Sequence, residues 1–187
     1  MEPNVFIRGL VTIKQDDMIY ADNVPNKFTN QGLSGILSGI ASYGVSNGAY
    51  SQYWWYLPST TWSMYIGTNT ATATTPAMIA LTNPIGAAPG TAPNTKAISV
   101  KNGTTDGIWA VTWSCVWTAG TVTGTLGEVA LYLQISQNMT YKWQPNNYNG
   151  GVFMTNRLSS ADGEFTSFAI DNTKPLSIDW KIQFSFN

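Results

Sequence analysis

The alternation of apolar and polar residues is most regular at the end of the chain, between Pro175 and Asn187. Six apolar residues alternate there with polar ones: Leu176, Ile178, Trp180, Ile182, Phe184 and Phe186. Successive side chains of a β-strand point to opposite faces, so this segment has one apolar and one polar face. A helix would spread the same residues around its whole circumference. We therefore predict a strand that covers a core on one side.

A second regular strand is predicted from Ile108 to Thr118. Its apolar residues share one face, and the tryptophans among them are interpreted as core: Trp109, Val111, Trp113, Cys115 and Trp117. A shorter strand, Lys96 to Lys101, precedes it, with a hairpin turn at Asn102-Gly103, a dipeptide that tolerates positive φ angles. Further strands are predicted at residues 5–13, 18–21, 63–68, 126–135, 152–157 and 165–170.

One short helix is predicted near residues 30–42. Its apolar residues follow helical spacing: Leu33, Ile36, Leu37 and Ile40. Either Thr29 or Asn30 can cap its first turn, because a short side-chain oxygen accepts from the free backbone N–H groups there.

These elements predict an all-β fold, a single β-sandwich domain spanning residues 1–187, jelly-roll-like, with one short helix and long loops. Residues 1–22 are predicted to form a strand or an N-terminal arm. Residues 69–94 carry four prolines and are predicted to form a long surface connection. Because residues 1–22 and 69–94 lack the periodicity needed to bury themselves, we expect neighbouring subunits to order both.

The composition is low in charge. Charged residues make up 10% of the chain, against about 25% in ordinary soluble domains. The net charge of −1 gives no field that would attract nucleic acid or an anionic membrane, and it does little to keep copies of the chain apart. No apolar run is long enough to span a membrane, and the first residues do not resemble a signal peptide. We therefore expect a protein that packs among protein partners, with neither nucleic acid nor membrane as a partner.

The residues that commonly carry catalysis are scarce. With no histidine, Ser-His-Asp and Cys-His sites and histidine-ligated zinc are excluded. The single cysteine, Cys115, is predicted to be a small buried hydrophobe. Asp162 and Glu164 could supply a pair of catalytic carboxylates or oxygen ligands for Ca²⁺, but the Asp-Gly step between them is typical of an ordinary turn. No catalytic residue, cofactor or metal site is predicted, and the chain is expected not to be an enzyme.

An aromatic segment between Tyr50 and Trp62 provides the candidate contact residues. They are Tyr50, Tyr53, Trp54, Trp55, Tyr56 and Trp62. Exposed tryptophan and tyrosine suit protein interfaces because they combine a large contact area with a polar tip. The same rings can stack on sugars, so protein and glycan remain alternative ligands.

A structural ion pair is predicted between Glu128 and Arg157. Glu128 interrupts an otherwise apolar strand, and Arg157 ends the strand expected beside it. Buried charges persist when they are paired and hydrogen-bonded.

The order of several short motifs carries a resemblance. They are residues 29–33 (TNQGL), 64–69 (MYIGTN) before a Thr/Ala/Pro run, 125–132 (TLGEVALY), 155–158 (TNRL) and 174–182 (KPLSIDWKI). In this order the chain resembles a loose family of tailed-bacteriophage virion structural proteins, of the tail, baseplate or head-decoration kind. That family commonly has a glycine-rich counterpart where this chain carries the aromatic segment, a departure that leaves the position in the virion open.

The resemblance implies a virion structural protein, assembled in the host cytoplasm as a capsid decoration or a tail or baseplate component. It also implies a homo-oligomer, expected to be a trimer, that contacts other virion proteins. A carbohydrate-binding or host-adhesion module is the alternative, and the low charge with many Thr and Asn residues also fits a subunit of an extracellular filament.

Overall fold

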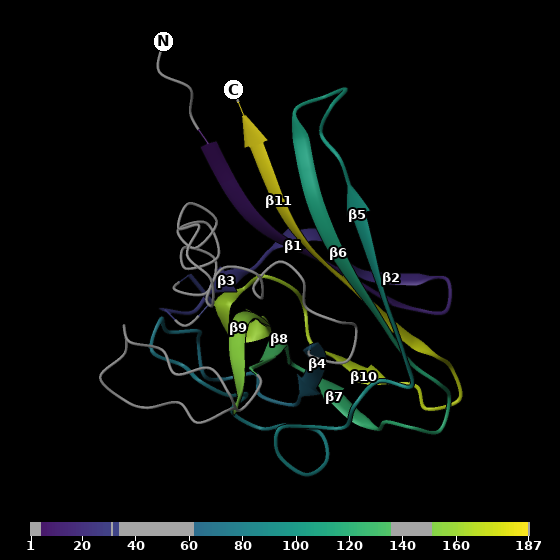
Figure 1. Cartoon of the computed structure of the whole chain (residues 1–187). Coiled ribbons are helices and arrows are strands. Elements are labelled where there is room, and N and C mark those ends of the chain that lie inside the picture. The colour runs from purple at the N-terminus through teal and green to yellow at the C-terminus, as the bar shows by residue number, and fades with distance from the viewer. Residues whose placement is uncertain (1–4, 31, 34–61, 136–150, 187) are drawn as a thin grey trace.

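The computed structural model describes residues 5–30, 32–33, 62–135 and 151–186, which are built mainly of antiparallel β-strands (Figure 1). The strands are β1 (Val5–Gln15), β2 (Met18–Pro25), β3 (Lys27–Phe28), β4 (Trp62–Gly67), β5 (Thr95–Lys101), β6 (Ile108–Trp117), β7 (Gly124–Leu126), β8 (Glu128–Ile135), β9 (Gly151–Ser159), β10 (Phe168–Ile170) and β11 (Leu176–Phe186). A 3₁₀ turn, η1 (Ser160–Asp162), follows β9. Within the described ranges there is no helix long and apolar enough to cross a membrane.

Two open antiparallel sheets pack against each other. The larger sheet has five strands in the order β2-β1-β11-β6-β5, the smaller has four in the order β3-β9-β8-β4, and β7 pairs with β10. The predicted all-β, sandwich-like fold is confirmed. The jelly-roll-like connectivity stays a prediction.

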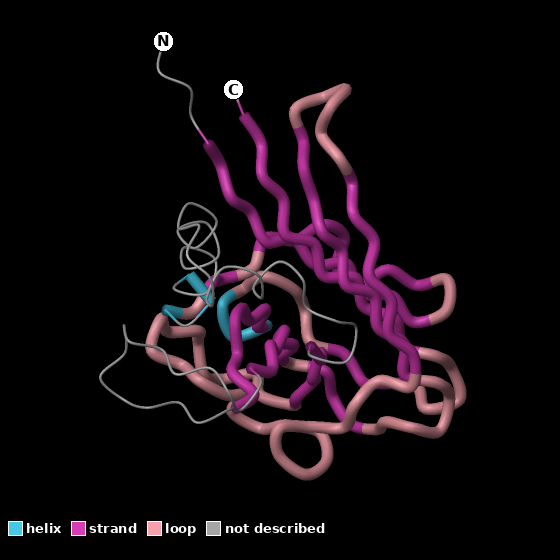
Figure 2. Tube along the Cα trace, in the orientation of Figure 1, coloured by secondary structure: helices cyan, strands magenta, loops and turns pink. Residues whose placement is uncertain are grey.

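The final strand, β11, lies in the middle of the larger sheet (Figure 2). All of its eleven residues pair with β1, and ten of them pair with β6 on the other side. Leu176, Ile178 and Trp180 are fully buried, whereas Asp179 between them is exposed. The alternation in the sequence therefore corresponds to a core face and an outer face, as predicted.

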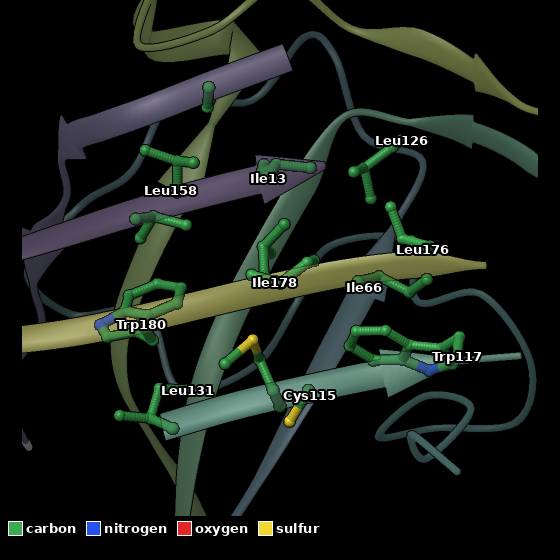
Figure 3. Close-up of a cluster of buried hydrophobic side chains, with 14 of the residues drawn as sticks. Ile13, Ile66, Cys115, Trp117, Leu126, Leu131, Leu158, Leu176, Ile178 and Trp180 are labelled. Carbon is green, nitrogen blue, oxygen red and sulfur yellow. The ribbon is translucent and has the colours of Figure 1, made fainter. Parts of the chain in front are cut away.

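The hydrophobic core fills the space between the two sheets. Figure 3 shows Ile13, Ile178 and Trp180 from the larger sheet facing Ile66, Leu131 and Leu158 from the smaller one. Cys115 is buried among them, and this burial raises the pKa of its thiol to about 12. The predicted role of Cys115 as a small core residue is confirmed.

Residues 5–15 and 18–25, which form β1 and β2, belong to the larger sheet, and this corrects the expectation that neighbouring subunits order them. β1 lies between β2 and β11, and Val11 and Ile13 are fully buried in the core. The apolar residues of β1 do not alternate regularly with polar ones, so the sequence pattern does not predict this burial. They are ordered because β11 supplies a complete ladder of backbone partners.

Most of the helix predicted near residues 30–42 lies outside the described residues. Its beginning is described, and Thr29 is the capping residue: its Oγ1 accepts from the Gly32 N–H at 3.1 Å. A Cβ atom at position 32 would lie 2.0 Å from the carbonyl oxygen of Thr155. Glycine there lets the chain pass against β9, where Thr29 N–H also donates to the Thr155 oxygen at 2.9 Å.

The β5–β6 hairpin differs in detail from the prediction. Its loop runs over residues 102–107, and the positive φ angle falls on Gly107, at 68°, and not on Asn102 or Gly103. The Asn102 side chain instead accepts from the Thr104 N–H at 3.2 Å, which stabilises a wider loop.

Candidate interaction surface

Of the six aromatic candidates, the structure describes only Trp62. Tyr50, Tyr53, Trp54, Trp55 and Tyr56 lie outside the described residues, so their role stays a prediction.

Trp62 is a core residue, which corrects its assignment as an interface or glycan-contact residue. It begins β4 and is buried, with its ring centroid 6.5 Å from that of Trp113 in an edge-to-face arrangement. The Lys96 ammonium lies 5.2 Å from the Trp62 ring centroid and donates to the Trp62 carbonyl oxygen at 2.8 Å. Stacking on a sugar needs an open ring face, and a buried indole offers none.

Glu128 and Arg157 form the predicted ion pair. Glu128 begins β8 and Arg157 lies on the adjacent strand β9, with both side chains fully buried at 0% exposure. The Arg157 Nε and Nη2 atoms donate to the same Glu128 oxygen, Oε2, at 2.9 and 2.7 Å. The pair therefore satisfies two charges that the sheet itself would leave without partners.

The ion pair also holds the segment 69–94 against the smaller sheet. Glu128 accepts from the backbone N–H groups of Thr82 at 3.2 Å and Asn83 at 2.7 Å. Arg157 Nη1 donates to Thr74 Oγ1 at 2.9 Å, and its Nη2 donates to the Thr72 carbonyl oxygen at 3.1 Å. One buried salt bridge thus supplies hydrogen-bond partners to both halves of a long connection.

A small apolar cluster reinforces this attachment on the outer face of the smaller sheet. It consists of Leu81, Ala130, Tyr132 and Met154, with Tyr65 and Met78 packed against it. The Tyr132 hydroxyl accepts from the Leu81 N–H at 2.7 Å, and burial raises the pKa of Tyr132 to about 12. The expectation that neighbouring subunits order residues 69–94 is therefore wrong. Contacts within the chain hold this segment, because β8 is buried on both faces.

The two carboxylates considered for catalysis or Ca²⁺ binding are engaged separately. Asp162 accepts from the Thr74 N–H at 3.0 Å and from Lys27 Nζ at 2.5 Å. Burial alone would raise the pKa of Asp162, but the bonds from Lys27 and Thr74 outweigh it and hold this pKa below its ordinary value. Glu164 accepts instead from the Ser159 N–H at 2.9 Å, and its burial raises its pKa.

Opposite pKa shifts are typical of acid–base pairs, but the contacts of these two carboxylates point to a structural role. The oxygens of Asp162 take donors from the segment 69–94 and from β3, and Glu164 holds the end of β9. Among the described residues, no group of three His, Cys, Asp or Glu side chains is placed to hold a metal ion.

These pKa shifts predict a dependence of stability on pH that differs in sign between the two residues. The lowered pKa of Asp162 stabilises the fold above its ordinary value of 3.8, and this contribution is lost as the pH falls through the lowered pKa. Asp162→Asn should therefore lower the melting temperature clearly at about pH 6 and much less at about pH 3.

Glu164→Gln serves as the matched variant. Because the pKa of Glu164 is raised above its ordinary value of 4.5, its ionised form destabilises the fold at higher pH. Glu164→Gln should raise the melting temperature at about pH 6 and leave it unchanged at about pH 3. Thermal denaturation followed by circular dichroism checks both. Parallel pH profiles for the two variants would contradict the assignment.

The larger sheet extends past the smaller one at the end where β1 begins, β11 ends and the β5–β6 hairpin lies (Figures 1 and 2). Toward this end of the larger sheet, the side chains on its core-facing side become progressively more exposed. On β6, Trp117 and Cys115 are buried, Trp113 and Val111 are half-buried, and Trp109 is 43% exposed. On β5, Ile98 is 37% exposed and Val100 is 70% exposed. The side of the larger sheet that packs on the smaller sheet therefore continues beyond it as an apolar surface that is partly or fully exposed. We call this surface the projecting face, and it consists of Trp109, Val111, Ile98 and Val100.

The interpretation of Trp109 as a core residue is corrected by this arrangement. Its register matches the other core residues of β6, since it pairs with Phe184 as Trp113 pairs with Trp180. The smaller sheet does not reach it. Its indole lies against Gly103, where an added Cβ would come within 2.5 Å of the ring. Trp109 thus packs on its own hairpin loop and keeps much of its surface exposed.

Comparison of the chain with protein-family models, with curated proteins and with solved structures finds no match. The interpretation of the function therefore depends on the chain's own surface and sequence.

Proposed function

We propose that this chain is a non-enzymatic structural subunit of a phage-like virion, a capsid decoration or a tail or baseplate component. It assembles with copies of itself and contacts neighbouring virion proteins. The observation that carries the proposal is the projecting face, whose apolar side chains continue the core pattern of the larger sheet into solvent. An exposed apolar surface of this kind is typical of a protein–protein interaction site.

Composition and chemistry support the same proposal. A chain with 10% charged residues and a net charge of −1 has little electrostatic repulsion between copies. Among the described residues, three charged side chains with buried atoms fix the connection 69–94: Glu128, Arg157 and Asp162. The order of the short motifs resembles that of phage virion proteins, and this resemblance is the reason for proposing a virion as the assembly.

Sugar binding is the alternative that the aromatic segment leaves open. Its one described candidate, Trp62, is buried in the core. The described surface therefore favours protein partners. The other five aromatic residues lie outside the described residues, so glycan binding by them stays a prediction from the sequence.

The test is the effect of Trp109→Ser on self-association of the full chain. Removing a central aromatic contact typically costs about 2 kcal/mol, so the dissociation constant should rise about 30-fold. Size-exclusion chromatography with light scattering over a range of concentrations measures this. Ile79→Ser, at an exposed apolar residue of the segment 69–94, is the control and should associate like the wild type. Unchanged association of Trp109→Ser, at an unchanged melting temperature, would contradict the proposal.

A further inference from the structure

The two sheets have four lateral edges, and three of them are short, partly covered or irregular. In the smaller sheet, β3 has only two residues. The end of β4 is covered on its free side by residues 83–85, since Thr68 N–H donates to the Asn83 oxygen at 2.8 Å and Ile85 N–H donates to the Ile66 oxygen at 2.9 Å. Neither edge offers a long row of free backbone groups to another chain.

The outer strand at one side of the larger sheet, β2, is irregular. Its pairing with β1 shifts register twice, between Val11 and Ile13 and between Ile13 and Lys14. Asn23 has a positive φ angle of 49°, and the strand ends at Pro25, which has no N–H to donate. Bulges and proline are devices that prevent a strand edge from pairing with another chain.

The fourth edge, β5, has none of these devices. Its seven residues pair with β6 without a register shift, contain neither proline nor glycine, and are all exposed. No strand of the described ranges pairs with its outer side, and Figure 1 shows β5 at the margin of the sheet. A long, regular, exposed edge strand is a ready template for strand addition.

The charges on β5 lie near its two ends. Lys96 lies over the Trp62 ring and donates to the Trp62 carbonyl oxygen, and Lys101 Nζ lies 2.5 Å from Asp106 Oδ2. The residues between them are uncharged: Ala97, Ile98, Ser99 and Val100. An inward-pointing lysine such as Lys96 is one of the devices that protect an edge, but it protects only the end of the strand where it lies, and the four residues beside it remain open to pairing.

We propose that β5 pairs antiparallel with β5 of a second copy of this chain, about a twofold axis near Ile98. The proposal deepens, and rests on, the proposed self-assembly. A copy of the same strand fits because this register places Lys96 opposite Val100 of the second copy and Lys101 opposite Thr95 of the second copy. No like charges therefore face each other, and the exposed Ile98 side chains meet at the axis.

The contact joins two five-stranded sheets into one continuous sheet and places the two projecting faces side by side. It differs from the trimer contact implied by the family resemblance. A twofold contact is isologous, and an assembly with dihedral symmetry contains both kinds.

Cross-linking of the full chain tests the register. Ile98→Cys should form a reducible dimer under mild oxidation, because the two positions 98 would face each other within disulfide distance. The native Cys115 is buried and does not compete. Thr95→Cys is the control: its two copies would lie about six residues apart along the paired strands, roughly 20 Å, and should not cross-link.

A pair of charge variants tests the contact without a covalent bond. Val100→Lys would face Lys96 of the second copy twice by symmetry, and should raise the dissociation constant at least about tenfold. Val100→Glu would face the same lysine and should associate at least as tightly as the wild type. Because Val100 is 70% exposed, neither change should alter the melting temperature of the monomer.

The outcomes separate this inference from the proposed function. Suppose that the wild type associates and that Trp109→Ser weakens this association. If Ile98→Cys then forms no dimer, and Val100→Lys and Val100→Glu have the same dissociation constant, the β5 contact is wrong and the proposed self-assembly stands. Cross-linking of Thr95→Cys as efficient as that of Ile98→Cys would also overturn the register. A wild type that stays monomeric at the highest soluble concentration, with no cross-linking, would contradict both.

Discussion

Removal of residues 175–187 is expected to abolish folding. The deletion takes away β11, which separates β1 from β6 in the larger sheet. Leu176, Ile178, Trp180 and Ile182 are all buried. Full burial stabilises such a side chain by about 1.5–3 kcal/mol, so four of them contribute roughly 6–12 kcal/mol. This is comparable with the whole net stability of a domain, about 5–15 kcal/mol.

Circular dichroism and thermal denaturation of the truncated chain check this prediction. Asp179→Asn in the full chain is the control, because Asp179 lies on the exposed face of the same strand and should change the melting temperature little. A soluble truncated chain that still melts cooperatively would show that β11 is dispensable and that the core is not organised around it.

Breaking the buried ion pair is expected to have the second largest effect. Glu128→Gln or Arg157→Met should each destabilise the fold by about 3–5 kcal/mol, because one charge remains buried without its partner. The double variant should cost less than the sum of the two. Glu128→Gln should also expose the segment 69–94 to limited proteolysis, since Glu128 accepts from the N–H groups of Thr82 and Asn83.

The exposed pair of Lys101 and Asp106 provides the matched control. Its side chains are 54% and 42% exposed, so solvent screens the attraction between their charges and the pair contributes little to stability. Lys101→Met or Asp106→Asn should therefore leave the melting temperature nearly unchanged. Equal effects at the buried and the exposed pair would mean that burial does not decide the contribution of Glu128 and Arg157.

The elements that could be predicted from the sequence are those whose side chains alternate strictly or break an apolar pattern. β11 is the clearest case, because its two faces differ at every position. Glu128 is the other: a charge within an apolar strand requires a partner, and Arg157 is the cation that the sequence places on the next strand. Both inferences use local patterns that a single strand or strand pair determines.

The features that the sequence could not predict depend on how far the smaller sheet extends over the larger one. Trp62, Trp109 and Trp117 all belong to strands, yet only Trp109 lies beyond the reach of the opposite sheet. The ordering of residues 69–94 was missed for a similar reason. It depends on Glu128, Arg157 and Tyr132, whose partners are distant in the chain and include backbone groups that leave no pattern in the sequence.

We propose that copies of this chain occupy regular positions in a virion, and electron microscopy of particles purified from the source tests this most directly. With gold-labelled antibodies raised against the full chain, we predict labelling at symmetry-related positions on a phage-like head, tail or baseplate. Chain recovered only in fractions free of particles, with the particles themselves unlabelled, would contradict the account.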